Sequence, residues 1–157
     1  MAWVTLSLRK MELIHQHNEL ELEDLKISRE ERQMARRYQL MQRQARNGNT
    51  QALGDEKSAY KQKLDDLNTQ YANDKTSVEY QQAYNEAKEE HDTQVNQLKT
   101  ETEDAVAELE EEAAYKEAEL EDEKVQIETQ MEAVAAEMDA IKQQISTDIQ
   151  NEAIQLH

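Results

Sequence analysis

Two histidines near the start of the chain are the first residues that could do chemistry. Glu12 precedes His15 by three positions, the spacing with which di-iron carboxylate bundles bind metal. Such a site needs a second Glu-x-x-His pair, but the residue three before His91 is Lys88. We therefore expect no metal centre and interpret His15 as a surface or interface residue. His17 falls on a heptad seam among leucines, where it could set the register, lie at the rim or act as a pH switch.

Two strongly charged segments could bind ligands of opposite charge. The acidic run from Glu108 to Glu112 lacks the glycine-containing turn of a calcium loop, so we expect a solvated helix face. The arginines around Tyr38 could contact nucleic acid, but the formal charge of the chain is −17 and no aromatic residue other than Tyr38 stands among them. We therefore expect no nucleic-acid partner.

No set of residues indicates catalysis. None of the serines stands in a Gly-x-Ser-x-Gly context, and neither a glycine-rich phosphate loop nor a Ser-His-Asp set is visible. The sequence therefore predicts no catalytic residue, no cofactor and no small-molecule substrate, and we expect that the protein is not an enzyme.

Helices must position these side chains. The 157 residues include no Pro, no Phe, no Cys and only two Gly. Glu, Gln, Ala, Lys, Leu and Met dominate, and these residues lose little rotamer freedom in a helix. Only 37% of the residues are hydrophobic and 4% are aromatic, so a large compact core is not expected.

The sequence shows neither a membrane-spanning segment nor a cleavable signal peptide. No apolar run approaches the ~18 residues that span a bilayer, and the first residues lack the basic and apolar regions of a cleavable signal peptide. We expect either a cytoplasmic protein or an extracellular filament exported by a route that needs no such signal.

The two glycines mark the clearest expected boundary. Gly takes a left-handed φ freely just after a helix, so Asn47-Gly48 is typical of a helix stop. Asp55, directly after Gly54, is a plausible N-cap for the next helix. The sequence therefore predicts a turn over 47–55.

A weaker boundary lies further along the chain. Thr76 and Glu79 have the spacing of a capping box, which predicts a kink near 73–77. The predicted organisation has three parts: an N-terminal helix over 1–46, the turn over 47–55, and a long acidic helix over 56–157.

Apolar side chains recur on two faces of the first segment. One column repeats at a strict interval of seven, which is typical of a coiled-coil core column. A second stripe alternates intervals of four and three, and it lies ~160° away at ~100° per residue, so the helix has two apolar faces. The column consists of Leu6, Leu13, Leu20, Ile27, Met34 and Met41, and the stripe of Val4, Leu8, Met11, His15, Asn18, Leu22 and Leu25.

The last part of the chain carries the cleanest stripe. A pattern that repeats at eleven from Tyr80 to Leu120, with Glu117 as its misfit, leads into it and is typical of a straight or slightly right-handed course. Opposite the stripe lies a column of small residues that would let another helix approach closely: Thr129, Ala133, Ala136 and Ala140. The stripe itself consists of Leu120, Ile127, Met131, Val134, Met138, Ile141, Ile145, Ile149 and Leu156.

The predicted turn leaves this stripe without a partner. A reversal at 47–55 would place Leu6 near Asn96, so no part of the same chain would cover the residues from Ile127 to Leu156. Burial of large apolar side chains stabilises by ~1.5–3 kcal/mol each, so we expect another copy to cover them. The predicted self-assembly interface consists of Leu6, Leu13, Leu20, Ile27, Met34, Met41, Ile127, Met131, Val134, Met138, Ile141, Ile145, Ile149 and Leu156.

Charge is segregated along the chain. Residues 26–46 hold seven basic and two acidic side chains, net +5, whereas residues 101–123 hold twelve acidic side chains and one Lys, net −11. With the turn at 47–55 these segments would not meet within one chain. We expect them to meet between chains, where they would set the stagger.

The sequence thus predicts an all-α fold: a rod-like, coiled-coil helical hairpin assembled into a multi-chain bundle or filament. It favours a non-enzymatic structural protein whose partners are copies of itself. The general pattern is similar to that of exported filament subunits of the flagellin and type III secretion kind, but no diagnostic motif accompanies it. The alternatives are a coiled-coil scaffold or chaperone-like adaptor for a basic protein and a metal-carboxylate bundle enzyme.

Overall fold

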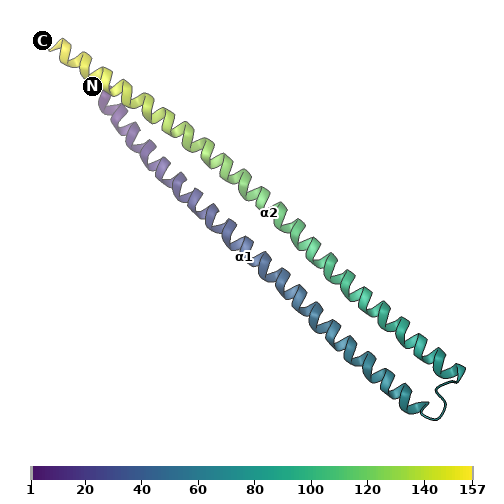
Figure 1. Cartoon of the computed structure of the whole chain (residues 1–157). Coiled ribbons are helices and arrows are strands. Elements are labelled where there is room, and N and C mark those ends of the chain that lie inside the picture. The colour runs from purple at the N-terminus through teal and green to yellow at the C-terminus, as the bar shows by residue number, and fades with distance from the viewer. Residues whose placement is uncertain (1, 157) are drawn as a thin grey trace. The chain divides into compact units, whose positions relative to one another are not determined.

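The computed structural model describes residues 2–156, and they form two α-helices joined by a turn. α1 runs over Ala2–Gln70 and α2 over Val78–Gln155 (Figure 1). Within these described residues there is no strand, so the expected all-α class is confirmed. Neither helix offers, in its described part, an apolar stretch long enough to cross a membrane.

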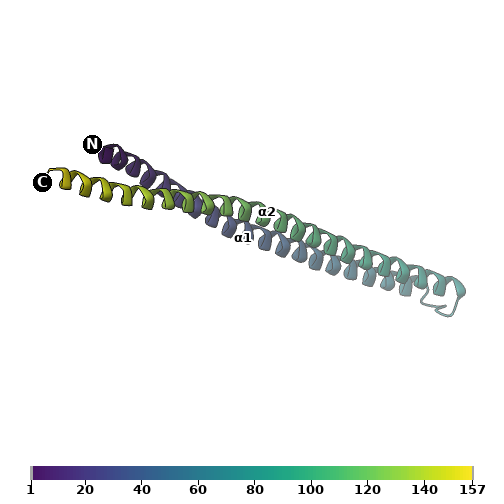
Figure 2. The ribbon, with the colours of Figure 1, turned by 90° about the horizontal axis from the view of Figure 1, so that it is seen from above.

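The chain divides into two compact units. Unit 1 combines the part of α1 up to Ala35 with the part of α2 from Ala114 onward. Unit 2 is the continuous segment Arg36–Ala113, which includes the turn. In each unit the two helical segments run antiparallel and pack side by side, and those of unit 1 cross when seen from above (Figure 2).

The chain reverses at residues 71–77. Tyr71 N–H donates to the carbonyl of Leu67 at 3.0 Å, and Asp74 N–H donates to the carbonyl of Tyr71 at 3.0 Å. Ser77 caps α2, because its hydroxyl accepts from the N–H of Tyr80 at 3.1 Å. The weaker boundary predicted near 73–77 is therefore the turn of the molecule, and its cap lies one residue after Thr76.

The turn predicted over 47–55 is wrong, because α1 continues through it to Gln70. Neither Gly48 nor Gly54 has a positive φ, so neither uses the freedom that makes glycine a helix stop. Each glycine inside a helix costs ~1 kcal/mol relative to Ala, a small amount beside the packing of a whole helix face. The predicted division of the chain into a helix over 1–46 and a helix over 56–157 is wrong for the same reason.

The helices of unit 1 meet along a seam of period seven. Leu13 is fully buried, and Ile27, Ile127 and Ile141 are at most 9% exposed. The heptad column predicted for the first helix supplies one side of this seam from Leu6 onward, and the C-terminal stripe supplies the other. The alternate seam positions of α1 are half-buried polar residues: Lys10, His17, Asp24 and Glu31.

The helices of unit 2 meet along a seam of period eleven. On α2 the predicted repeat begins with a half-buried Tyr80 and an exposed Tyr84, which is 39% exposed. From there to the end of the unit its members are at least half-buried: Ala87, His91, Val95, Leu98, Thr102, Val106, Leu109 and Ala113. On α1 the same spacing appears in half-buried sets, the last of which ends at the first residue of the turn: Gln42, Ala45 and Asn49; Leu53, Glu56 and Tyr60; Leu64, Leu67 and Tyr71. Both helices thus share one period within this unit.

The C-terminal stripe has a partner within its own chain. In unit 1 the indole Nε1 of Trp3 donates to Glu152 Oε2 at 2.9 Å, and Arg9 Nε donates to Glu137 Oε1 at 3.2 Å. The expectation that Leu6 lies near Asn96 is therefore wrong. It followed from a turn placed too early in the chain.

Candidate functional site

Most residues of the predicted self-assembly interface lie in the seam between the two helices of one chain. Four are buried there: Leu13, Ile27, Ile127 and Ile141. Seven more are half-buried: Leu6, Leu20, Met34, Met131, Val134, Met138 and Ile145. Exposed side chains remain only at Met41, Ile149 and Leu156. The buried and half-buried members of this set pack α1 against α2 within one chain.

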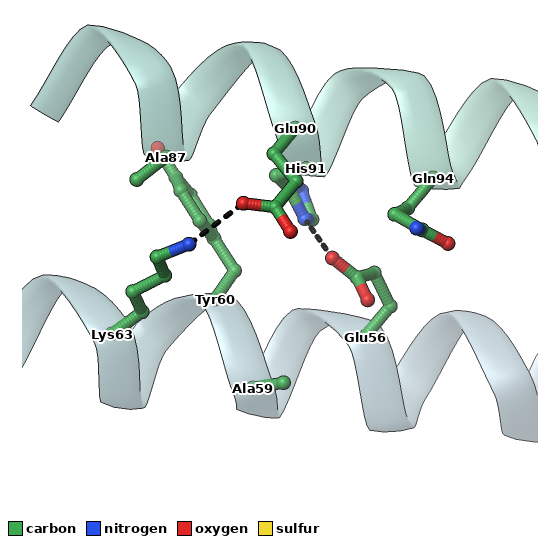
Figure 3. A pocket seen from close by; sticks show the side chains of 8 residues that line it. All are labelled: Glu56, Ala59, Tyr60, Lys63, Ala87, Glu90, His91 and Gln94. Atoms are coloured by element: carbon green, nitrogen blue, oxygen red, sulfur yellow. Dashed lines mark hydrogen bonds and ion pairs between the residues drawn. The ribbon is translucent and has the colours of Figure 1, made fainter. Parts of the chain in front are cut away.

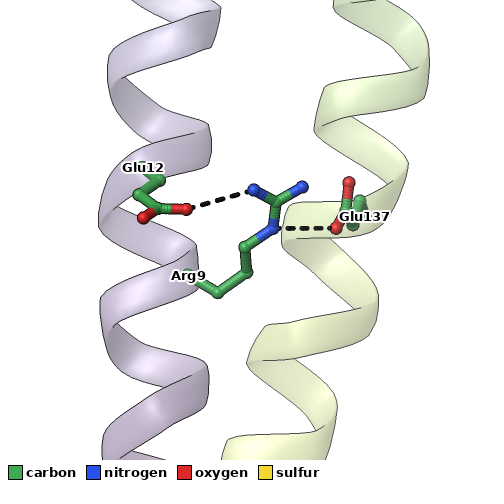
Figure 4. A network of polar contacts seen from close by, with 3 residues as sticks. All are labelled: Arg9, Glu12 and Glu137. Carbon is green, nitrogen blue, oxygen red and sulfur yellow. Dashed lines mark hydrogen bonds and ion pairs between the residues drawn. The ribbon is translucent and has the colours of Figure 1, made fainter.

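A bridge of three charged residues crosses the seam of unit 1 (Figure 4). Arg9 on α1 lies between two carboxylates, with Nη1 donating to Glu12 Oε2 at 3.1 Å and Nε donating to Glu137 Oε1 on α2 at 3.2 Å. These hydrogen bonds raise the pKa of Arg9. All three side chains are well exposed, so the bridge defines the pairing of the helices more than it strengthens it.

A polar cluster joins the helices of unit 2 near the turn (Figure 3). The rings of Tyr60 and His91 stack with centroids 4.1 Å apart, and His91 Nδ1 donates to Glu56 Oε1 at 3.2 Å. Beside them Lys63 Nζ donates to Glu90 Oε2 at 2.7 Å, which raises the pKa of Lys63 and lowers that of Glu90.

The contacts of this cluster link α1 to α2 within unit 2. Its shallow pocket is lined by the same charged and aromatic side chains with Ala59, Ala87 and Gln94, and none of the lining residues is a Ser or Cys nucleophile. One signal for this cluster is present in the sequence, because the spacing of Glu56, Tyr60 and Lys63 puts them on one face of α1. The signal points to a site only when a turn at 71–77 brings His91 and Glu90 opposite these residues. With the turn predicted over 47–55, the sequence does not identify the cluster.

Glu12 and His15, the pair with metal-binding spacing, each contact another partner, and Glu12 lies beside Arg9. His15 pairs with Glu19, Nε2 to Oε1 at 3.0 Å, and both side chains are exposed. The Nδ1 atom of His17, a seam residue, lies 3.6 Å from Oε1 of Glu21. Among residues 2–156, no group of three or more potential ligands stands close enough to hold a metal ion.

The basic and acidic segments meet within one chain. In unit 2, Arg46 lines a shallow groove together with Glu103 and Glu110. Tyr38, which is 6% exposed, has a raised pKa, first because it is buried and then because Glu112 lies beside it. The expectation that the two segments meet only between chains is therefore wrong. Their charges of +5 and −11 leave a net −6.

The second apolar stripe of α1 is not covered by α2. Its large side chains are exposed, from 38% at Val4 to 60% at Leu8 and 66% at Met11. Leu22 and Leu25, further along unit 1, are 53% and 63% exposed. We call this stripe, with His15 and Asn18 between its apolar residues, the outer face of α1. It is the candidate functional surface.

Comparison of the chain with protein-family models, with curated proteins and with solved structures finds no match.

Proposed function

We propose that this chain is a non-enzymatic structural protein that self-assembles by helical packing into a filament or another higher-order assembly. The observation that carries this proposal is the outer face of α1. Five large apolar side chains, Val4, Leu8, Met11, Leu22 and Leu25, follow one stripe and lie in water in the single chain. Scattered exposed apolar residues are normal, but five on one helix face, in two groups separated by His15 and Asn18, indicate an interaction surface.

The energy available at this surface is substantial. Fully burying a Leu, Met or Val side chain stabilises by roughly 1.5–3 kcal/mol. The stripe has heptad spacing and no β-branched residue except Val4, so another helix can pack along it. We infer coiled-coil packing both along this surface and along the seam of unit 1, where the period of seven favours a left-handed wrap.

The proposed interface differs from the one that the sequence alone suggests. The C-terminal stripe is occupied by α1 of the same chain, so only residues beyond that seam are available to another copy. The outer face of α1 takes over the role that the sequence assigned to Ile127 through Ile149.

A second candidate function is a scaffold or chaperone-like adaptor for a basic protein. The net −6 that remains after the acidic and basic segments meet is the observation that favours it. Such an adaptor would present the acidic part of α2 to its client and would stay a small oligomer.

Sedimentation velocity and electron micrographs of the purified full chain test the proposal. We expect species that grow with protein concentration, together with elongated particles. A chain that remains a monomer or a small oligomer of fixed size at every concentration, yet binds a basic protein such as a histone, would favour the adaptor and overturn the structural role.

A further inference from the structure

We propose that, within unit 1, the outer face of α1 packs antiparallel on the outward face of α2 from a second copy of this chain. This inference rests on the proposed function and names the surface that meets the outer face of α1. It follows from how apolar, polar and charged residues are ordered along the two faces.

The outer face of α1 changes character along its length. Its stripe is mostly apolar from Val4 to Leu25 and continues at the same spacing into Arg29 and Arg32. Both arginine side chains are exposed, and the Nε of Arg32 reaches only the backbone carbonyl of Ser28, at 3.2 Å. A partner surface must therefore be apolar over one stretch and acidic over the next.

The outward face of α2 has this order in reverse. Opposite the seam, an exposed stripe of apolar and small residues begins at Val125, which is 50% exposed, and continues through Thr129, Ala133, Ala136 and Ala140. Toward the N-terminal side the same stripe holds the exposed Asp122, with the exposed Glu119 beside it. The two faces therefore match when the helices run antiparallel.

The sizes of the side chains match in the same register. The α1 stripe alternates intervals of four and three, and on α2 the same alternation runs through Asp122, Gln126, Thr129, Ala133 and Ala136, with Val125 next to Gln126. An antiparallel register that sets Leu22 beside Thr129 therefore sets Leu25 beside Gln126. The two polar residues of the outer face, Asn18 and His15, then lie opposite Ala133 and Ala136, whose small side chains leave room for them. Arg29 comes beside Asp122, and Arg32 comes beside Glu119.

Pairing of two α1 outer faces is disfavoured by charge. An antiparallel pair centred on His15 would bring Glu12 of one copy beside Glu19 of the other. A parallel pair would bring Arg29 and Arg32 beside their own copies. Like charges in such flanking positions destabilise a helix pair, so the acidic end of α2 is the better partner.

The consequence is an assembly that can grow beyond a dimer. The two faces are different surfaces of one molecule, so a copy that uses its α1 face still has its α2 face free for the next copy. A heterologous contact of this kind forms a ring if the rotation closes and a filament if it does not.

Cysteine cross-linking tests the contact directly, since the natural chain has no Cys. One preparation carries Leu22→Cys and another carries Thr129→Cys, and the two are mixed and oxidised. We expect the mixed disulfide to form readily. As a matched control, Leu22→Cys mixed with Ala140→Cys should link weakly, because Ala140 lies eleven residues from Thr129, about 16 Å along the helix. A dominant disulfide between two Leu22→Cys chains would overturn the inference in favour of pairing between α1 faces.

A charge variant separates this inference from the proposed function. Leu22→Glu should reduce assembly at least tenfold by sedimentation while helix content and thermal midpoint stay unchanged. Val78→Glu adds the same charge at another exposed position, 72% exposed, and should assemble like the parent. If Leu22→Glu assembles like Val78→Glu, the contact is wrong but self-assembly stands. If the parent itself does not assemble, the proposed function fails.

Discussion

Individual side chains in the two seams show how tightly the helices are held, and Tyr38 is the most deeply buried aromatic residue. Its pKa is raised, chiefly by burial and further by Glu112, so the folded chain favours the neutral phenol. A raised folded pKa means stability that is complete below the unfolded pKa and is lost as the pH rises through the folded pKa.

We therefore expect the free energy of unfolding to fall as the pH rises above about 10, the range in which an unfolded tyrosine ionises. Tyr38→Phe should lose less stability over the same range, because it has no phenol to ionise. Urea unfolding at a series of alkaline pH values measures this. Tyr115→Phe, at a side chain that is 67% exposed, is the control and should follow the parent. Equal alkaline losses in Tyr38→Phe and the parent would contradict the assignment.

Asp24 is a seam residue that weakens unit 1. Its Oδ1 is shielded from solvent and has no hydrogen-bond partner among the described residues, in a position between Leu20 and Ile27 where a coiled coil places an apolar side chain. An unsatisfied buried polar atom costs ~1–3 kcal/mol. Asp24→Leu should therefore raise the free energy of unfolding by ~1 kcal/mol or more. Glu23→Leu, at an exposed neighbouring position, should leave it within ~0.5 kcal/mol. A loss of stability in Asp24→Leu would show that the carboxylate has a role that the seam does not reveal.

At the scale of elements, the position of the turn decides how every other residue is placed. Glycine, asparagine and a following Asp are strong local signals, and they predict a turn over 47–55. The choice of turn, however, depends on whether apolar positions can face each other over dozens of residues. Two glycines cost ~2 kcal/mol within a helix, and continuous seams on both sides of residues 47–55 outweigh that.

Substitution of the glycines distinguishes a helix from a turn. No atom lies within 4 Å of where a Cβ would stand at Gly48 or Gly54, and neither has a positive φ. Gly48→Ala and Gly54→Ala should therefore each stabilise the chain by ~0.5–1 kcal/mol, measured by urea unfolding. Ala at a left-handed position would destabilise instead, so a loss of stability in either variant would restore the turn at 47–55.

The sequence predicts the α2 half of the fold better than the α1 half. The repeat at eleven residues on α2 is visible because Val95, Leu98, Val106 and Leu109 are apolar, and the seam confirms it. On α1 the same period is hidden, because polar residues such as Gln42, Asn49 and Glu56 occupy seam positions. A method that scores apolar residues alone cannot find such a seam. The stripe that packs against each apolar stripe cannot be predicted either, because the pairing depends on the position of the turn.

At the scale of the whole molecule, the seam and the outer faces must be tested separately. Ile141 and Ile145 lie on the seam of unit 1, so replacing both by Asp should disrupt the packing of α1 on α2 even in dilute monomer. Circular dichroism at low concentration should show lost helix and a lower thermal midpoint. Val125→Asp with Thr129→Asp, on the outward face of α2, is the matched control and should keep both values. A folded Ile141→Asp, Ile145→Asp monomer would show that the seam contributes little.

The net charge of −17 determines how assembly responds to salt. Copies with this net charge repel one another on average, whereas exposed ion pairs such as those proposed for Arg29 and Arg32 are worth only ~0–1 kcal/mol. We therefore expect the repulsion to exceed the attraction of the ion pairs. Added salt should strengthen assembly, because it screens the repulsion between copies and shortens the Debye length to ~10 Å at 0.1 M. Mild acid should act in the same direction by protonating glutamates. Sedimentation at several salt concentrations measures the effect. If association weakens steadily as salt is added, attraction between the arginines and acidic residues of neighbouring copies exceeds the general repulsion, and the charge pairs supply strength as well as register.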